Sequence, residues 1–379
     1  MIPRTLAESL KSRFFSGKAL IVLGPRQVGK TTLIREILSG RDHLFLNGDD
    51  PDNRRLLTEI GTSGLRSVIG KYKIVFIDEA QRIPEIGLTL KLITDQFKDV
   101  QLIVSGSSAL EINQRTQEPL TGRKFEYQLF PVSWEEFEGF AGFPESEAQL
   151  EERLIYGMYP DVITHRHNAA EILKQLTASY LFKDILALAS VRKPDLLERL
   201  LRALALQIGN EVSLNELSGL LGVDKVTVDR YIDLLEQAFI VFRLNSFGRN
   251  LRKEIKFNRK IYFRDNGVRN TLINNLNPVS LRSDKGALWE NFLISERLKI
   301  QGNHHLLASN YFWRTVHGQE IDFVEESGGK IRAFEFKWSG ARARISKSFL
   351  ETYSAEGKVI DRQNFREFVN ATDWPTPAH

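Results

Sequence analysis

Apolar residues in the first part of the chain gather in short runs separated by amphipathic segments. A short apolar run bounded by turn residues is typical of a strand buried on both faces of a sheet. Such runs predict strands at 19–23, 43–47, 74–77, 101–104 and 127–132. Segments with helical spacing, such as 33–38, lie between them. Alternating strands and helices predict a parallel sheet with helices on both faces.

The pattern changes after residues 139–149, which contain glycine, proline and acids and therefore predict a linker. Beyond it helical spacing dominates, and Ser213 and Gly222 have the positions of an N-cap and a helix-ending glycine. The expected order is helices at 171–189, 196–208, 213–221 and 224–235 and then strands at 239–244 and 260–263. A helix, a turn, a helix and two strands in this order predict a winged helix.

The last part of the chain mixes the two patterns. An amphipathic helix is expected at 286–296, followed by strands at 311–314, 320–324 and 331–337. The turn signal at 327–329 makes the last two strands antiparallel. The predicted domains are 1–140, 150–265 and 266–365, and no clear element is expected from residue 365 onward.

The composition limits the classes of function. An apolar fraction of 42% and a charged fraction of 26% are ordinary for a globular protein. The chain has no cysteine, which excludes disulfides, thiolate zinc sites and cysteine nucleophiles and fits a reducing cytoplasm. No apolar run approaches the roughly eighteen residues of a membrane span, so we expect a cytoplasmic protein without a membrane partner. The net charge is only +4, but a pI of about 9.0 leaves room for local basic surfaces.

The segment 24–32, GPRQVGKTT, has the pattern of a phosphate-binding loop between a predicted strand and a predicted helix. Its glycines allow turns that bring backbone N–H groups to a phosphate at a helix N-terminus. Lys30 is expected to reach the β- and γ-phosphates of ATP, and the Thr31 hydroxyl to ligate Mg²⁺. The alternative is a strand-to-helix turn that binds no nucleotide. The expected nucleotide-binding residues are Gly24, Pro25, Arg26, Gln27, Val28, Gly29, Lys30, Thr31 and Thr32.

Two acids, Asp78 and Glu79, follow the strand at 74–77. Ligands of open α/β sheets bind at the carboxyl ends of the strands. Asp78 is therefore expected to hold Mg²⁺, through a water, and Glu79 to orient or deprotonate the attacking water. Paired acids at a strand end can also be a solvated cap, but the loop at 24–32 favours the catalytic role.

Two further residues are candidates for catalysis. Ser105, at the end of the strand at 101–104, is expected to sense the γ-phosphate or align the water, although a helix N-cap is an equally simple interpretation. Arg123 is a candidate arginine finger for the γ-phosphate of a neighbouring subunit. The alternative is an ion pair with Glu126 or another local acid.

Together these motifs resemble a large bacterial and archaeal family of AAA-type ATPases. The resemblance runs to about residue 360 and rests on GPRQVGKTT, its spacing to IVFIDEAQ, then SGSSAL, LTGRKFEYQLFPVSWEEF and GMYP. Members of that family carry an uncharacterised C-terminal domain similar to restriction endonucleases. The resemblance therefore implies an α/β fold class: an AAA-type P-loop parallel sheet, then a winged-helix domain, then an α/β restriction-endonuclease-like domain.

The winged-helix region holds the candidates for nucleic-acid binding. In DNA-binding winged helices the second helix enters the major groove, so Lys225, Thr227 and Arg230 would contact DNA. Three acids on the same helix oppose this interpretation, and the alternative is a winged helix that packs against protein with a solvated basic hairpin. Residues 243–264, here called the basic segment, hold eight bases against one acid and predict a phosphate-binding surface. The bases are Arg243, Arg249, Arg252, Lys253, Lys256, Arg259, Lys260 and Arg264.

A helical Glu290, then Asp322, then Glu335-x-Lys337 is similar to the PD-(D/E)xK nuclease pattern. Glu335 and Lys337 point to the same face of a strand, beside the strand that carries Asp322. The three carboxylates would bind a second Mg²⁺, and Lys337 would position or activate water. The alternative is a Glu–Lys pair on a solvated face with Asp322 unrelated.

We therefore predict an ATP-hydrolysing AAA-type protein that uses ATP and Mg²⁺ and acts on DNA, double-stranded or branched. Water would attack the γ-phosphate in line, with Lys30, Thr31 and Mg²⁺ holding charge. If Arg123 is a finger, the active form is a homo-oligomer such as a hexameric ring. One alternative is an ATP-regulated, Mg²⁺-dependent nuclease. Another is a nucleotide-gated switch that binds protein and has no DNA activity.

Overall fold

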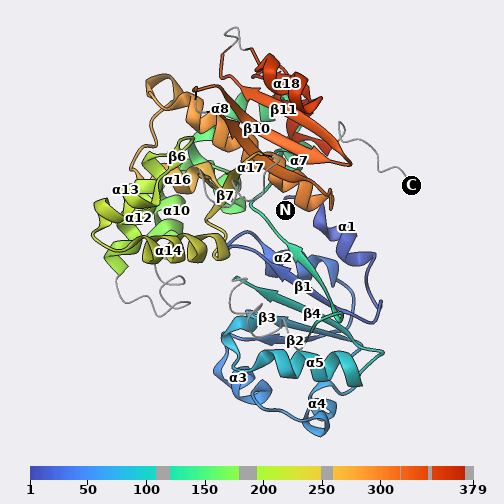
Figure 1. The fold of residues 1–379 in the computed structure, drawn as a ribbon. Helices are drawn as coiled ribbons and strands as arrows, with labels where there is room; N and C mark the ends of the chain where they lie inside the picture. The colour runs from blue at the N-terminus through green and yellow to red at the C-terminus, as the bar shows by residue number, and fades with distance from the viewer. Residues whose placement is uncertain (108–119, 179–193, 249–258, 316, 340–343, 372–379) are drawn as a thin grey trace. The chain divides into compact units, whose positions relative to one another are not determined.

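The computed structural model describes residues 1–107, 120–178, 194–248, 259–315, 317–339 and 344–371 (Figure 1). The chain divides into two compact units. The N-terminal unit is Pro3–Pro131 with Gln237–Phe239, and the C-terminal unit is Met1–Ile2, Val132–Glu236 and Ile240–His379. None of the helices in the described ranges has the length and apolar character needed to cross a membrane.

A five-stranded sheet, parallel throughout, organises the N-terminal unit. Its order is β2 (Leu44–Asn47), β3 (Ile74–Asp78), β4 (Gln101–Gly106), β1 (Ala19–Leu23) and β5 (Lys124–Gln128). Every residue of β1, β3 and β4 is buried, as their apolar runs predicted. The expected strand at 127–132 instead begins at Lys124, because β5 is an edge strand with several partly exposed residues and so lacks a continuous apolar run.

Helices flank this sheet as a parallel topology requires. The main core joins alternate residues of β1 and β3 to α3, α4 and α5, and in Figure 1 α1 and α2 lie on the other side of the sheet. The helices are α1 (Leu6–Lys11), α2 (Lys30–Ile37), α3 (Pro51–Leu57), α4 (Thr62–Ile69), the 3-10 helix η1 (Ala80–Arg82) and α5 (Ile86–Gln96).

A seven-stranded mixed sheet organises the C-terminal unit. The parallel pairing of β7 with β9, in which Asn245 lies beside Tyr311, makes one sheet of the strands on both sides of the predicted boundary at 265. Its order is β12 (Glu356–Ile360), β11 (Lys330–Phe336), β10 (Glu320–Ser327), β9 (Ser309–Arg314), β7 (Val241–Ser246), β8 (Arg259–Phe263) and β6 (Glu211–Val212).

The helix–turn–helix segment of this unit has the predicted caps. The Ser213 hydroxyl accepts from the backbone N–H of Glu216 at the start of α13, and Gly222 ends that helix with φ 69°. Helices of the unit that precede β7 are α7 (Trp134–Ala141), α8 (Phe143–Tyr156), α9 (Pro160–Thr164), η2 (Arg166–Asn168), α10 (Ala169–Leu176), α12 (Pro194–Leu206), α13 (Leu214–Leu221) and α14 (Lys225–Gln237). Those that follow are α16 (Asn266–Leu272), η4 (Val279–Leu281), α17 (Lys285–Asn303), α18 (Lys347–Tyr353) and α19 (Phe365–Val369).

Two sequence expectations are wrong here. Residues 139–149 are not a linker, because Gly142, with φ 82°, makes a tight turn between α7 and α8. The region after 365 does contain an element, since α19 packs Phe365 and Phe368 into the core. Both mistakes arise because glycines and short helices give weak sequence signals even where tertiary packing fixes them.

The GMYP motif at 157–160 lies in a buried polar junction rather than at a reactive site. The Asp265 carboxylate accepts from the backbone N–H of Met158 at 2.7 Å and of Val268 at 3.1 Å. A Cβ added at Gly157 would lie 2.1 Å from that carboxylate, so only glycine fits. Burial raises the pKa of the Asp265 carboxyl, and the backbone donors compensate part of its desolvation.

Candidate functional site

The loop at 24–29 joins β1 to α2 and is held tightly by its neighbours. A Cβ at Gly24 would lie 2.1 Å from the carbonyl oxygen of Leu129, so the loop can approach the end of β5 only with glycine at this position. Gly29, immediately before α2, has φ 92°. The Arg4 guanidinium donates to the carbonyl oxygens of Val28 at 2.8 Å and Phe130 at 2.6 Å. Arg4 lies just before α1, so it braces the loop from outside the motif.

Lys30 begins α2, and its ammonium turns back over the loop. The Nζ atom donates to the carbonyl oxygens of Gly24 at 2.9 Å and Pro25 at 2.8 Å. The side chain is nearly buried, and an ammonium in such a place needs acceptors around it. Its position at the mouth of the loop is the one that a phosphate-binding lysine needs.

Asp78 connects three elements at the carboxyl edge of the sheet. Its Oδ2 atom accepts from the Thr31 hydroxyl at 2.7 Å. Its Oδ1 atom accepts from the Ser105 hydroxyl on β4 and from the backbone N–H of Glu79 at 3.1 Å. The fold thus brings Thr31, Asp78 and Ser105, predicted from three separate segments, into direct contact.

Glu79 occupies a left-handed backbone conformation, with φ 48° and ψ 42°. Such a conformation is unfavourable for a residue with a Cβ and is often found at functional sites. The Gln81 amide holds the Glu79 carboxylate, donating from Nε2 to its Oε2 at 2.5 Å and to the Ser107 hydroxyl at 2.8 Å. Gln81 and Ser107 were not predicted from the sequence, although the position of Gln81 within the motif IVFIDEAQ, two residues after Glu79, was a usable signal.

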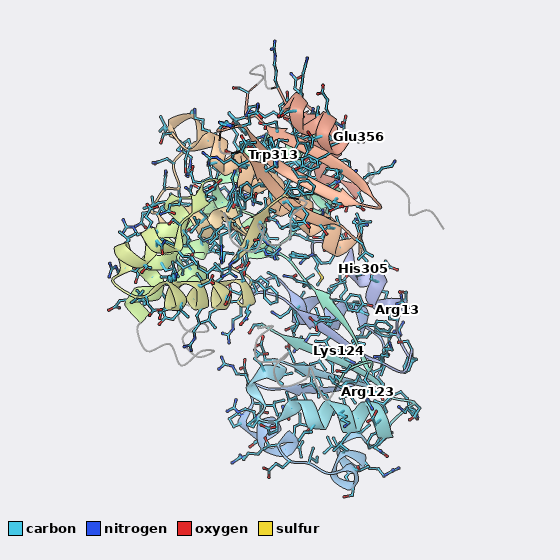
Figure 2. The ribbon with its side chains drawn as sticks, in the orientation of Figure 1. Arg13, Arg123, Lys124, His305, Trp313 and Glu356 are labelled. Atoms are coloured by element: carbon cyan, nitrogen blue, oxygen red, sulfur yellow. The ribbon has the colours of Figure 1, made fainter. Side chains whose placement is uncertain are left out.

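Arg123 lies at the opposite edge of the same sheet (Figure 2). It precedes β5, and the parallel register pairs Lys124 with Ala19 at the start of β1. Its Nε atom donates to Asp95 at 2.6 Å, so the local ion pair expected as the alternative is present, with Asp95 rather than Glu126. Because β1 runs for five residues between this edge and the loop, Arg123 does not reach the carboxyl edge of its own chain's sheet, where Thr31, Asp78 and Ser105 meet. Its role toward a neighbouring subunit stays a prediction.

The described bases of the basic segment are paired within the protein. Arg243, on β7, lies 2.9 Å from Asp229 and 2.6 Å from Asp233 of α14. Arg259, on β8, also pairs with Asp229, at 2.6 Å. Lys260 is buried against carboxylates, and the Arg264 guanidinium lies 4.8 Å from the centre of the Phe242 ring. The prediction of a phosphate-binding surface made of all eight bases is therefore wrong for Arg243, Arg259, Lys260 and Arg264; Arg249, Arg252, Lys253 and Lys256 lie outside the described residues.

Of the three candidate DNA contacts on α14, one caps the helix and two are exposed. Thr227 closes the start of its helix, since its hydroxyl donates to Asp224 at 2.7 Å and its backbone N–H to the same carboxylate at 2.9 Å. Lys225 and Arg230 are exposed. The cap explains Thr227 without a base contact.

The residues of the nuclease-like pattern do gather in the C-terminal unit. Asp322 on β10 and Glu335 on β11 lie on adjacent antiparallel strands, as predicted, and Glu290 lies on α17. Lys337 lies 3.3 Å from Glu335. Burial raises the pKa of Glu290 and of Glu335 to about 7, and the negative charge of Asp322 adds to both shifts. Within the described residues, however, no three acidic or histidine side chains are grouped so that they could hold a metal ion.

The five-stranded parallel sheet, the loop at 24–29 and the residues at the carboxyl edge of the sheet define an AAA-type P-loop ATPase domain. Residues 16–138 match the family described as AAA domain. Residues 147–279 and 285–377 match two domains of unknown function, DUF8612 and DUF4143. The chain is 30% identical over 344 residues to the uncharacterised protein Rv2008c of Mycobacterium tuberculosis, covering 88% of this chain and 73% of that protein. This chain belongs to the same family as Rv2008c.

More distant relatives match over a similar length of this chain. An uncharacterised protein of Haemophilus influenzae is 26% identical over 342 residues, covering 82% of this chain and 80% of its own length. Among solved structures, the Walker-type ATPase PABY2304 of Pyrococcus abyssi matches with a TM-score of 0.51 and 16% identity, covering 72% of this chain and 96% of its own. That likeness supports the ATPase fold.

Proposed function

We propose that this protein binds ATP with Mg²⁺ at the carboxyl edge of the N-terminal sheet and hydrolyses it with the residues gathered there. One observation carries the proposal: the Thr31 hydroxyl and the Asp78 carboxylate meet at 2.7 Å, and Thr31 directly follows Lys30 at the start of α2. A hydroxyl and a carboxylate are hard oxygen ligands, which suit Mg²⁺. P-loop ATPases hold their metal between a hydroxyl of the loop and an acid of the following motif.

The proposed roles follow from the chemistry of phosphoryl transfer. Bound Mg²⁺ would neutralise charge on the β- and γ-phosphate oxygens. Lys30 would leave the carbonyl oxygens of Gly24 and Pro25 for the phosphates, and Ser105 would keep Asp78 oriented. Glu79 is the candidate base for the attacking water, held by the Gln81 amide.

The test is the steady-state rate of ATP hydrolysis by the full chain. We expect Lys30→Ala to abolish nucleotide binding, and Glu79→Gln to keep binding while lowering kcat by about 10²-fold to 10⁴-fold. Lys73→Ala is a matched control, because Lys73 precedes β3 at the end far from Glu79 and its side chain lies in a surface ion pair with Asp99. Absence of ATP binding by calorimetry in the presence of Mg²⁺ would refute the proposal.

Action on DNA, in an oligomer such as a ring, is the second candidate function. The exposed Lys225 and Arg230 on α14 favour it, because two of the three acids that weakened the interpretation, Asp229 and Asp233, are paired with Arg243. The test compares ATPase rate and DNA affinity with double-stranded and branched DNA at two salt concentrations. Arg230→Gln should reduce the salt slope of log affinity by about one, whereas Arg243→Gln should not. An ATPase rate that DNA leaves unchanged, without measurable DNA binding, would favour the protein-binding switch.

A further inference from the structure

The nuclease resemblance implies a magnesium ion at Glu290, Asp322 and Glu335, but their surroundings do not fit one. The Glu290 Oε1 atom already accepts from the Lys260 ammonium at 3.1 Å and from the Tyr262 hydroxyl. The Asp322 Oδ2 atom accepts from the backbone N–H of Phe336 at 2.8 Å. Divalent magnesium needs several free oxygen ligands at close to ideal geometry. Here one oxygen of each of the three carboxylates already has a protein partner, since the Glu335 Oε2 atom accepts from Lys337.

A lysine from outside the nuclease-like pattern supplies the positive charge instead. Lys260 lies on β8, and its side chain is 1% exposed. Its ammonium lies 2.5 Å from Glu320 on β10, in addition to Glu290 on α17, and 5.4 Å from the centre of the Phe312 ring on β9. Burying an ammonium is tolerated only where it is paired, and this one has two carboxylates and an aromatic face.

The rest of the cluster is paired in the same way. Lys337 balances Glu335 at 3.3 Å, and Arg314 approaches Glu320 from the solvent side at 3.8 Å. Burial raises the pKa of the Asp322 carboxyl, and the positive charges of Lys260 and Lys337 oppose that rise. Two lysines thus lie among four carboxylates, where the nuclease pattern would require a dication.

We propose that Lys260 is the resident cation of this cluster and that its ammonium excludes a divalent metal from the nuclease-like residues. The cluster then has a structural purpose: one ammonium joins β8, which follows the helix–turn–helix segment, to β10 and α17. A metal ion approaching the carboxylates would have to displace an ammonium that cannot reach solvent without breaking two ion pairs. The C-terminal unit is accordingly not a magnesium-dependent nuclease.

The test measures Mn²⁺ binding to the full chain without nucleotide, by the loss of the free-ion electron paramagnetic resonance signal. Wild-type protein and Asp322→Asn should bind the same number of ions, because any binding at the ATP site is common to both. Lys260→Met should bind up to one additional ion, and adding Glu290→Gln should remove it. If Asp322→Asn loses one ion relative to wild type, or abolishes a Mn²⁺-dependent cleavage of DNA by the wild-type chain, the proposal is wrong.

Thermal unfolding gives an independent measurement that does not depend on metal. Lys260→Arg, which keeps the charge, should lower the Tm much less than Lys260→Met. The double variant Lys260→Met, Glu290→Gln should recover part of the loss, because it removes a carboxylate left without its cation. Equal Tm values for Lys260→Arg and Lys260→Met would contradict the role of the charge. If Lys260→Met does not fold, the comparison of wild type with Asp322→Asn still decides whether the cluster binds metal.

Discussion

Gly48 offers a direct test of how the position of Glu79 is fixed, because it comes directly after β2, beside the end of β3. Its backbone N–H donates to the carbonyl oxygen of Asp78 at 2.8 Å. A Cβ added there would lie 2.3 Å from the carbonyl oxygen of Glu79. Glu79 can therefore adopt its left-handed conformation because Gly48, which follows the neighbouring strand β2, has no side chain. We expect Gly48→Ala to move the Glu79 carboxylate, the proposed base, without touching the loop at 24–29.

The size of the effect follows from the contact. Carbon and oxygen atoms approach to about 3.3 Å in favourable contacts, so Gly48 and Glu79 must separate by about 1 Å. A displacement of about 1 Å at a catalytic group can lower a rate by about 10²-fold, which is about 2.7 kcal/mol of transition-state stabilisation. Overpacking of this kind also lowers stability by about 1–3 kcal/mol, which leaves most domains folded.

The assay is steady-state ATP hydrolysis, combined with calorimetric binding of a non-hydrolysable ATP analogue and with thermal unfolding. Gly48→Ala should lower kcat by about 10²-fold with analogue affinity within a few-fold of wild type. Gly61→Ala is the matched control, since Gly61 precedes α4 in the same unit with φ −86°, and an added Cβ there meets nothing within 4 Å. Wild-type kcat in a folded Gly48→Ala protein would refute the reasoning.

Three other substitutions have defined outcomes. Gln81→Ala removes the amide that holds Glu79 and should lower kcat by about tenfold at unchanged ATP affinity, as one net hydrogen bond predicts, whereas an unchanged kcat would remove Gln81 from the site. Glu290→Gln tests the pH dependence of the free energy of unfolding. Burial raises the pKa of this carboxyl from 4.5 to about 7, so the folded state binds a proton that the unfolded state has lost between these pH values. The free energy of unfolding of the wild type should therefore fall by up to about 3 kcal/mol as pH rises from about 4.5 to 7, and the variant should lack this fall. Arg123→Ala removes a partly exposed ion pair with Asp95 and should leave the Tm and kcat nearly unchanged. A loss of kcat of about 10³-fold or more would instead establish a finger in trans.

The residues at the carboxyl edge of the N-terminal sheet could be placed from the sequence because each part of that edge is local. The runs that became β1 and β3 are buried on both faces, so their apolar character is continuous and their ends are marked by the loop and by Asp78. The sequence alone does not reveal that Gly48 must accommodate Glu79, because that contact joins two strands through backbone atoms. Edge strand β5 was misplaced for a similar reason: its pairing with β1 is set by hydrogen bonds, while several of its side chains are partly exposed.

The charged residues were harder to assign, because a count of bases does not say whether they face solvent. Lys260 belongs by sequence to the basic segment, yet its partner Glu290 is thirty residues away on α17, and no motif connects them. Its burial could not be deduced from spacing. The same limit applies to the nuclease pattern, whose residues are adjacent as predicted but whose counter-ion comes from another part of the chain.

For α14 a sequence signal did exist. Asp229, Asp233 and Glu236 are four and then three residues apart, which places them along one stripe of a helix. Three acids on one stripe repel one another unless a cation lies against them, and the first strand after the helix carries Arg243. The helical spacing of the acids therefore predicts a partner inside the protein. Applied first, this rule assigns Arg243 to the acids and leaves Lys225 and Arg230 as the bases on α14 that face outward, which is the arrangement that the fold adopts.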